Sequence, residues 1–177
     1  YRVAIVGTGG IANAHMDAIR QTNERVNIIA AVDIDANRVA DFCVQHTIPA
    51  HYTDLAEMLA AEKPDLVHIC TPPGLHRDQV IACLEAGAHV WCEKPLCASL
   101  AEFDAMEAVS ARTDRWVSPV FQWRFGAGAQ HLKNLIVAEA LGRPLVGSCQ
   151  TMWYRSSDYY AAPWRGKWAT ELGGPTV

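Results

Sequence analysis

The sequence predicts an α/β fold in which helices cover both faces of a doubly wound parallel sheet. Up to Phe121, short apolar runs alternate with polar-studded segments of helical length, which is the pattern of consecutive βαβ units. Several of the apolar runs are nearly continuous, such as VNIIAAVD at 26–33, as expected of strands that are buried on both faces.

Six segments are predicted to be strands, because each is an apolar or β-branched run of strand length. They are residues 2–7, 26–33, 50–52, 65–71, 88–93 and 115–121. The helices predicted between them are residues 9–22, 35–46, 53–60, 75–87 and 99–112. Thr53 or Asp54, and likewise Ser99, suit helix N-caps, since their oxygens can accept from the free amides of a first turn. Gly87 suits the position just after a helix.

Composition excludes several classes of function. The chain has 177 residues, 50% of them hydrophobic and 19% charged, with a net charge of −4. A negative chain without a basic patch argues against nucleic-acid binding. No apolar run approaches the roughly 20 residues of a membrane span, and no secretory signal is recognisable. The six cysteines form no CxxC pair and match no zinc spacing, which indicates reduced core thiols in a cytoplasmic protein and no metal site.

The pattern changes after Phe121. A helix is predicted over about 128–140 and a strand over 144–154, followed by a segment rich in aromatic residues and glycine. We expect residues 1–121 to form one domain and residues 122–177 to be the truncated start of an α+β second domain, because one strand cannot make a stable sheet. The tryptophans of this tail suit either the core of that domain or stacking on a sugar ring.

Three glycines join the first predicted strand to the first helix. Gly7, Thr8, Gly9, Gly10, Ile11 and Ala12 fit the pattern G-x-G-x-x-A, the dinucleotide-binding fingerprint in its required context. Gly7 would make the tight turn, Gly9 would let the backbone approach a pyrophosphate, and Ala12 would let helix and strand pack closely. The helix N-terminus would offer its free amides and dipole to the phosphates.

An acidic residue at the end of the second strand strengthens this prediction. Asp33 lies 21 residues after Ala12, where a carboxylate can bind the 2′-hydroxyl of an adenosine ribose. It would repel a 2′-phosphate, so NAD is favoured over NADP. Arg38 could moderate that preference, or it is a solvated surface residue; Ile34, beside the acid, is expected to contact the cofactor.

Two further motifs follow the fourth and fifth strands, at the carboxyl edge where open α/β sheets bind ligands. They are TPPGLH at 71–76 and CEKPL at 92–96. With the glycine loop they resemble the Gfo/Idh/MocA oxidoreductases, which include glucose–fructose oxidoreductase and inositol dehydrogenase. The resemblance continues through RxF and WR…GG in the tail. It implies a cofactor site that also includes Thr71, Pro72, Pro73, His76, Glu93, Lys94, Gln122, Arg124, Trp164 and Arg165.

The same resemblance implies that Lys94 is the catalytic residue. In the family this lysine faces the substrate hydroxyl that becomes a carbonyl, where an ammonium can stabilise developing negative charge or relay a proton. The resemblance also implies a cis Lys94–Pro95 bond and a Glu93 carboxylate on the nicotinamide-side ribose. The family's second catalytic group, usually a histidine, has no match up to Val177, so we expect the chain to be part of a longer protein.

The sequence therefore predicts an NAD-dependent oxidoreductase that transfers a hydride between nicotinamide and a hydroxyl of a sugar, cyclitol or related polyol. We expect a small-molecule substrate, no nucleic-acid or membrane partner, and a homo-oligomer when the protein is complete. The alternatives are a non-catalytic dinucleotide-binding sensor of the same fold and a flavoprotein with the same glycine loop. His15, behind that loop, could face the cleft, whereas His68 in mid-strand is expected to be buried and hydrogen-bonded.

Overall fold

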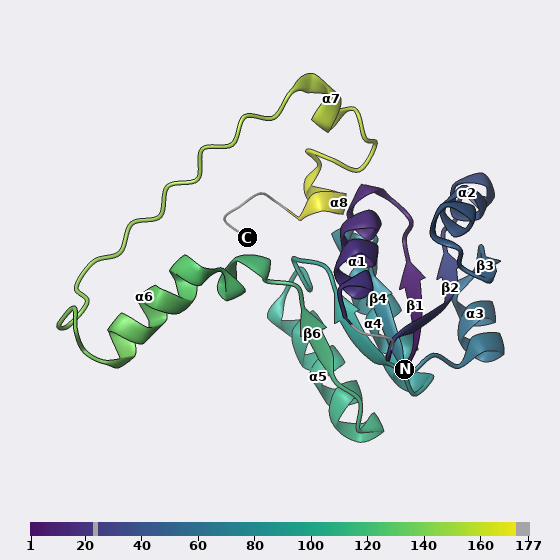
Figure 1. Ribbon diagram of the computed structural model, residues 1–177, viewed down its shortest axis with the longest axis horizontal. Coiled ribbons are helices and arrows are strands. Elements are labelled where there is room, and N and C mark those ends of the chain that lie inside the picture. Colours follow the sequence, from purple (N-terminus) through teal and green to yellow (C-terminus); the bar gives the residue numbers. More distant parts are fainter. Residues whose placement is uncertain (23–24, 173–177) are drawn as a thin grey trace.

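The computed structural model describes residues 1–22 and 25–172, and its centre is a six-stranded sheet in the order β3-β2-β1-β4-β5-β6. The strands are β1 (Arg2–Val6), β2 (Asn27–Val32), β3 (Ala50–Tyr52), β4 (Leu66–Ile69), β5 (His89–Cys92) and β6 (Val117–Pro119). All neighbouring strands are parallel. Because β2 and β4 lie on opposite sides of β1, the strand order reverses there, which confirms the doubly wound topology (Figure 1).

Helices connect the strands and lie against the sheet (Figure 1). They are α1 (Gly10–Arg20), α2 (Ala36–His46), α3 (Leu55–Glu62), α4 (His76–Glu85) and α5 (Leu100–Thr113). The side chains of Asp35, Asp54 and Ser99 accept hydrogen bonds from first-turn amides of α2, α3 and α5, which confirms the predicted cap at Ser99 and selects Asp54 over Thr53. Gly87 follows α4 with a φ of +87°, as predicted for a residue just after a helix.

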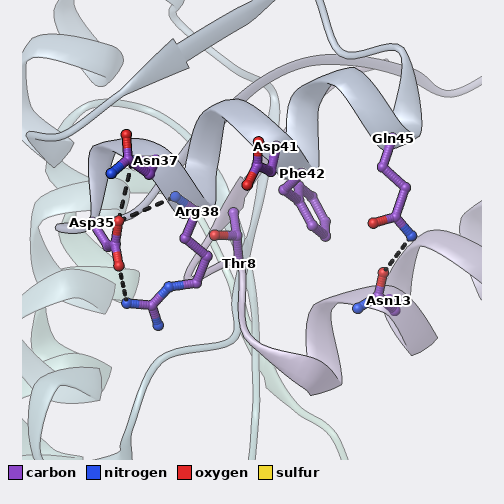
Figure 2. A pocket seen from close by; sticks show the side chains of 8 residues that line it. All are labelled: Thr8, Asn13, Asp35, Asn37, Arg38, Asp41, Phe42 and Gln45. Atoms are coloured by element: carbon purple, nitrogen blue, oxygen red, sulfur yellow. Dashed lines mark hydrogen bonds and ion pairs between the residues drawn. The ribbon is translucent and has the colours of Figure 1, made fainter.

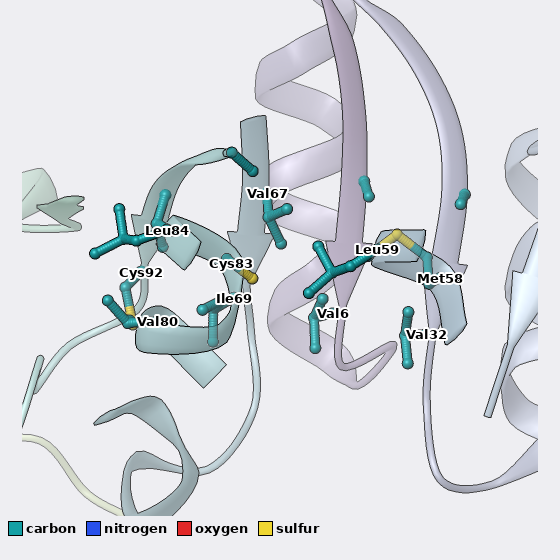
Figure 3. Close-up of a cluster of buried hydrophobic side chains, with 14 of the residues drawn as sticks. Val6, Val32, Met58, Leu59, Val67, Ile69, Val80, Cys83, Leu84 and Cys92 are labelled. Atoms are coloured by element: carbon teal, nitrogen blue, oxygen red, sulfur yellow. The ribbon is translucent and has the colours of Figure 1, made fainter. Parts of the chain in front are cut away.

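Alternation along the strands sends neighbouring side chains into two separate cores. Ala4 and Val6 of β1 belong to the larger core, to which α3, α4 and α5 contribute side chains such as Leu84 (Figure 3). Ile5 belongs to the other core, with side chains of α1 and α2. Trp91 of β5 is 39% exposed, so the described residues leave the sheet partly open there.

Four of the cysteines pack inside the protein, as predicted. They are Cys43, Cys70, Cys83 and Cys92. Burial raises the pKa of Cys83 to about 12, which keeps that thiol protonated and unreactive. Within the described ranges, no three His, Cys, Asp or Glu side chains group as a metal site would require, and no helix is both long and apolar enough to cross a membrane.

Beyond the sheet, the chain continues through four short helical elements. They are the 3₁₀ turn η2 (Gln122–Phe125), α6 (Ala127–Val137), α7 (Ser157–Tyr160) and α8 (Trp168–Glu171). The strand predicted over 144–154 is wrong, because this exposed segment has no regular secondary structure. No strand in the described part of the chain pairs with it, and an extended segment gains stability as a strand only by pairing. α8 returns to the sheet and contacts η1 (Pro73–Leu75), the 3₁₀ turn before α4 (Figure 1).

Candidate functional site

The turn after β1 depends on Gly7. Its φ is +87°, and a Cβ atom there would lie 2.9 Å from the backbone carbonyl carbon of Cys70 and from the amide nitrogen of Thr71. The Gly7 amide also donates to the Val32 carbonyl at 2.8 Å. Gly7 is therefore required by the packing of β1 between the ends of β2 and β4, before any ligand is considered.

Gly9 and Gly10 differ from Gly7, because the protein's own packing does not require them. Gly9 is the extended N-cap of α1, and no described atom lies within 4 Å of a Cβ built on either residue. The space that the missing side chains leave open lies at the N-terminus of α1, whose free amides can bind an anion. Ile11, the next residue, is 43% exposed.

Asp33 holds the glycine loop from the end of β2. Its Oδ2 accepts from the amide and the hydroxyl of Thr8, both at 2.9 Å, and its Oδ1 accepts from the Asp35 amide at 3.1 Å. Arg38 Nη2 lies 3.7 Å from Oδ1. The sequence pointed only to a ribose contact, whereas the structure gives this buried carboxylate a second role as a support of the loop. A carboxylate oxygen has two lone pairs, so Oδ1 can still accept from a hydroxyl.

A polar cavity of about 400 Å³ lies beside this loop, between α1 and α2 (Figure 2). It is lined by Thr8, Asn13, Asp35, Asn37, Arg38, Asp41, Phe42 and Gln45. Backbone and side-chain hydrogen bonds from Arg38 hold the pKa of Asp35 below its usual value. Of these lining residues, only Thr8 and Arg38 are predicted site residues. The helical spacing of Arg38, Asp41 and Gln45 is the signal that places the last two on the same face of α2. Ile34 is 91% exposed.

His76, one of the predicted cofactor residues, lies inside the protein. The side chain is fully buried. Its Nδ1 lies 2.8 Å from the Pro95 carbonyl oxygen and its Nε2 lies 2.8 Å from the Thr71 carbonyl oxygen. Both ring nitrogens are thus engaged within the protein, where the ring joins the loop after β4 to the loop after β5.

The other residues of the TPPGLH motif also pack partly against the protein. Pro73 is buried, whereas Thr71 and Pro72 are half-buried. The Thr71 hydroxyl donates to Gln79 Oε1 at 2.5 Å. The backbone of this loop is therefore more available to a ligand than its side chains are.

Glu93 is the last of three buried ionisable side chains that contact one another in series, His68, His15 and Glu93. His15 Nε2 lies 3.0 Å from Glu93 Oε1, and His15 Nδ1 lies 2.9 Å from His68 Nδ1. Burial alone would raise the pKa of Glu93, but the hydrogen bond from His15 and the nearby positive charges hold it below its usual value. Burial, and then the neighbouring His15, lower the pKa of His68 to about 3. Glu93 is therefore ionised and accepts from His15, and His68 is neutral.

The burial predicted for His68 is confirmed, but its connection to Glu93 could not be seen in the sequence. His15 comes from α1, His68 from β4 and Glu93 follows β5. The three meet because β4 lies between β1 and β5 in the sheet, and no spacing along the chain encodes that contact.

We expect His68 to make the protein less stable in acid. Its pKa is lower in the folded protein than in the unfolded chain, so protonation favours the unfolded chain. The free energy of unfolding should fall between about pH 6.5 and pH 3, by at most about 1.4 kcal/mol per pH unit. His68→Asn keeps a polar group near the Nδ1 position but does not titrate, so urea unfolding at several pH values should show a shallower dependence.

The matched control for that measurement is His131→Asn on the exposed surface of α6, which should keep the wild-type dependence on pH. The ionised Glu93 remains in both variants and contributes in the same direction, since its folded pKa is lowered. Equal slopes in wild type and His68→Asn would contradict the assignment.

Lys94 leaves the sheet directly after Glu93. Its amide donates to Glu93 Oε2 at 3.2 Å, the Lys94–Pro95 bond is cis as predicted, and its side chain is exposed. In the described part of the chain, its ammonium forms no ion pair within 4.0 Å. The ammonium is therefore available to a ligand at the carboxyl edge of the sheet.

The remaining predicted site residues lie after the sheet. Gln122 and Arg124 are exposed on η2, just after β6. Trp164 and Arg165 are half-buried just before α8, the helix that returns to η1. The structure thus brings the second pair toward the loop after β4 and leaves the first pair at the β6 end of the sheet.

Residues 1–121 match the model of the GFO_IDH_MocA family, described as an oxidoreductase family with an NAD-binding Rossmann fold. The chain is 30% identical over 171 residues to 4-carboxy-2-hydroxymuconate-6-semialdehyde dehydrogenase of Sphingobium sp. strain SYK-6, which is 97% of this chain and 54% of that protein. It is 33% identical over 152 residues to inositol 2-dehydrogenase 3 of Saccharopolyspora erythraea, 84% of this chain and 44% of that protein.

Among solved structures, the WlbA dehydrogenase of Bordetella pertussis in complex with NADH and UDP-GlcNAcA has a TM-score of 0.91 and 30% identity, over 96% of this chain and 49% of that one. The chain spans about half the length of the curated relatives it matches. The family model matches more than half of the chain, and the parallel sheet, the glycine loop and the motifs after β4 and β5 agree with it. The chain therefore belongs to the Gfo/Idh/MocA family of oxidoreductases with an NAD-binding Rossmann fold.

Proposed function

We propose that the complete protein is an NAD-dependent oxidoreductase that transfers a hydride between nicotinamide and a CH–OH group of a sugar, cyclitol or related polyol. The position of Lys94 is the observation that supports this proposal most. Its exposed ammonium follows β5 beside the ionised Glu93, at the carboxyl edge that also carries the glycine loop. Ligands of open α/β sheets bind across this edge.

The residues at this edge fit a dinucleotide. Gly9 and Gly10 leave open the space that a Cβ would fill, and the amides of α1 would hold the pyrophosphate. Asp33 Oδ1 would accept from the adenosine ribose, and the exposed Ile34 side chain would lie against the adenine. Glu93 would accept from the nicotinamide-side ribose. When bound, NAD supplies the hydride chemistry.

Other residues would line the same cofactor through backbone or side-chain contacts. We propose that they are Thr8, Ile11, Arg38, Thr71, Pro72, Pro73, Gln122, Arg124, Trp164 and Arg165.

Lys94 would act on the substrate oxygen. When the neighbouring carbon loses its hydride, that oxygen becomes a carbonyl and must also lose its proton. The Lys94 ammonium would donate a hydrogen bond that stabilises the negative charge developing on the oxygen, and in its neutral form the amine would accept the proton. The Glu93 carboxylate beside it would help to orient the lysine, because the two charges attract each other.

The extent of the similarity supports one substrate class over another. The Sphingobium and Bordetella matches cover 97% and 96% of this chain and so include the tail; the first protein is named for a carboxylated semialdehyde, and the second was crystallised with UDP-GlcNAcA. The match to the Saccharopolyspora inositol dehydrogenase covers 84%. We therefore favour a substrate that carries an anionic group over a neutral polyol.

Hydride transfer by the full-length protein tests the proposed function. NADH formation would be followed by its ultraviolet absorbance, with NAD⁺ and two groups of compounds: neutral polyols such as myo-inositol, and acidic sugars such as glucuronate. NADH formation with any of them supports the proposal. Binding of NAD⁺ without turnover of any compound would favour the sensor instead.

Asp33→Ala should weaken NAD⁺ binding by about 10- to 100-fold, because hydrogen bonds to a charged group contribute about 1.5 to 3 kcal/mol. The variant loses the ribose acceptor and the two bonds that hold Thr8. NADP⁺ binding should change less, since a repelling charge disappears at the same time. Calorimetric titration with both nucleotides measures the two affinities.

The control for this prediction is Asp104→Ala, which removes an exposed carboxylate from α5, away from the glycine loop and the cavity beside it. It should bind NAD⁺ like wild type. An Asp33→Ala protein with unchanged NAD⁺ affinity would refute the role assigned to this residue.

We also propose that residues 1–121 are the cofactor-binding domain, that residues 122–177 begin a substrate-binding and oligomerisation domain, and that the complete protein is a cytoplasmic homo-oligomer. Light scattering of the full-length protein measures its oligomeric state.

A further inference from the structure

Two arginines of the tail gather around one tyrosine ring. The guanidinium carbon of Arg165 lies 3.8 Å from the ring centroid of Tyr159 and 4.3 Å from that of Trp164. The guanidinium carbon of Arg155 lies 4.6 Å from the Tyr159 centroid and 4.8 Å from that of Trp153. We call Trp153, Arg155, Tyr159, Trp164 and Arg165 the arginine–aromatic cluster. It joins two stretches of chain on either side of α7.

Stacking leaves the donors of both arginines available. A guanidinium that lies over an aromatic ring uses its face for the ring, while its N–H groups point outward in the plane and can bind a carboxylate or phosphate in bidentate geometry. In the described part of the chain, Arg155 has no ion pair, and Arg165 has one, with Glu171 at 3.6 Å. Among the described residues, Glu171 thus pairs with only one of the two guanidiniums, and the positive charge of Arg155 can attract an anion.

The cluster is connected to the edge of the sheet that carries the proposed active site. Trp153 lies 6.1 Å, centroid to centroid, from Trp123 of η2, which follows β6. On the other side, Trp164 and Arg165 precede α8, which contacts η1 in the TPPGLH motif (Figure 1). The segment that carries the two arginines therefore connects η2, which follows β6, with the turn η1, which follows β4.

Contacts within the tail fix the orientation of Arg165. Glu171 accepts from the Gly166 amide as well as pairing with Arg165. The Thr170 hydroxyl donates to the Trp164 carbonyl at 2.5 Å. Because both bonds close the turn between Trp164 and α8, they hold Arg165 against Tyr159, and a preorganised guanidinium loses less entropy when it binds an anion.

We propose that the arginine–aromatic cluster binds the anionic group, a carboxylate or a phosphate, of the substrate of the proposed oxidoreductase. This inference rests on the proposed function and gives the tail the role of binding part of the substrate. Arg155, which has no ion pair among the described residues, supplies the two parallel donors. Arg165, which we also place beside the cofactor, supplies a second positive charge, and the aromatic rings hold both guanidiniums and cover the apolar face of the substrate.

The test is a calorimetric titration of the full-length protein, saturated with NAD⁺, with three matched probes: glucuronate, glucose 6-phosphate and glucose. The acids should bind at least tenfold more tightly than glucose. The stronger of the two acids identifies the anion as carboxylate or phosphate. Arg155→Gln should reduce the preference to less than threefold, and Arg155→Lys, which keeps the charge but loses the two parallel donors, should give an intermediate value.

Arg143→Gln is the matched control, because Arg143 is an exposed arginine of the same tail outside the cluster. It should retain the full preference for acids. All three variants should bind NAD⁺ like wild type and keep its Tm. Failure of both acids to bind, or equal preference for them in wild type and Arg155→Gln, would overturn the proposal. Failure of the wild-type protein to bind NAD⁺ would instead overturn the proposed function.

Discussion

Lys94→Ala should lower kcat of the full-length protein by about 10²- to 10⁴-fold, the range expected for a group that stabilises charge or transfers a proton in the transition state. NAD⁺ affinity should change by less than about threefold, since the cofactor contacts proposed around Lys94 come mainly from Glu93 and the glycine loop. Steady-state kinetics together with NAD⁺ titration separates the two effects, because a loss confined to kcat indicates an interaction made only in the transition state.

Lys94→Arg distinguishes the two ways in which this residue could act. Arginine keeps a positive charge but does not lose its proton in a protein. Partial recovery of kcat relative to Lys94→Ala would indicate charge stabilisation, whereas equal loss in both variants would indicate proton transfer. Lys133→Ala, on the exposed surface of α6, serves as the control and should have wild-type kcat. Full activity in Lys94→Ala would rule out a catalytic lysine at this position.

Gly7→Ala should lower the stability of the fold, whereas Gly9→Ala should leave the fold stable and weaken NAD⁺ binding. Alanine at position 7 must adopt a φ of +87° and place its Cβ 2.9 Å from backbone atoms of Cys70 and Thr71. Backbone cannot move aside easily, so we expect a loss of about 3 kcal/mol or more in the free energy of unfolding. Alanine at position 9 meets no described atom within 4 Å and should cost less than about 1 kcal/mol.

NAD⁺ binding completes this comparison. Gly9→Ala should fold but bind NAD⁺ at least tenfold more weakly, since its methyl group would occupy the space in front of α1 that the pyrophosphate needs. Thermal unfolding and calorimetric titration of the two variants measure stability and affinity separately. A Gly9→Ala protein that binds NAD⁺ normally would show that the open space at this residue is not the phosphate site.

Ionisation within the site also follows from contacts between distant segments. Glu93 is buried, yet its carboxylate is stabilised in the ionised form by His15. His15 in turn contacts His68, which is neutral because burial lowers its pKa to about 3. Because α1 also carries the glycine loop at its N-terminus, this buried series of side chains links the proposed pyrophosphate site to the residue next to Lys94.

The sequence by itself determined where the strands and helices lie and that they form a doubly wound parallel sheet. Alternating apolar and polar segments predicted all six strands, and capping residues such as Ser99 set helix boundaries, because both signals act between residues close together in the chain. The sequence also placed the glycine loop, Asp33 and Lys94 at the ends of predicted strands, which form the binding edge of a parallel sheet, and the family resemblance singled out Lys94 among them.

Only the tertiary structure decided what these residues contact. His76 became a buried bridge between two loops, Asp33 became a support for Thr8, and His15 met Glu93 across 78 positions of sequence. The segment 144–154 has strand-like residues but no partner in the described part of the chain, so it formed no strand. Propensity and periodicity are local, whereas burial, pairing and hydrogen bonding depend on which segments the sheet order brings together.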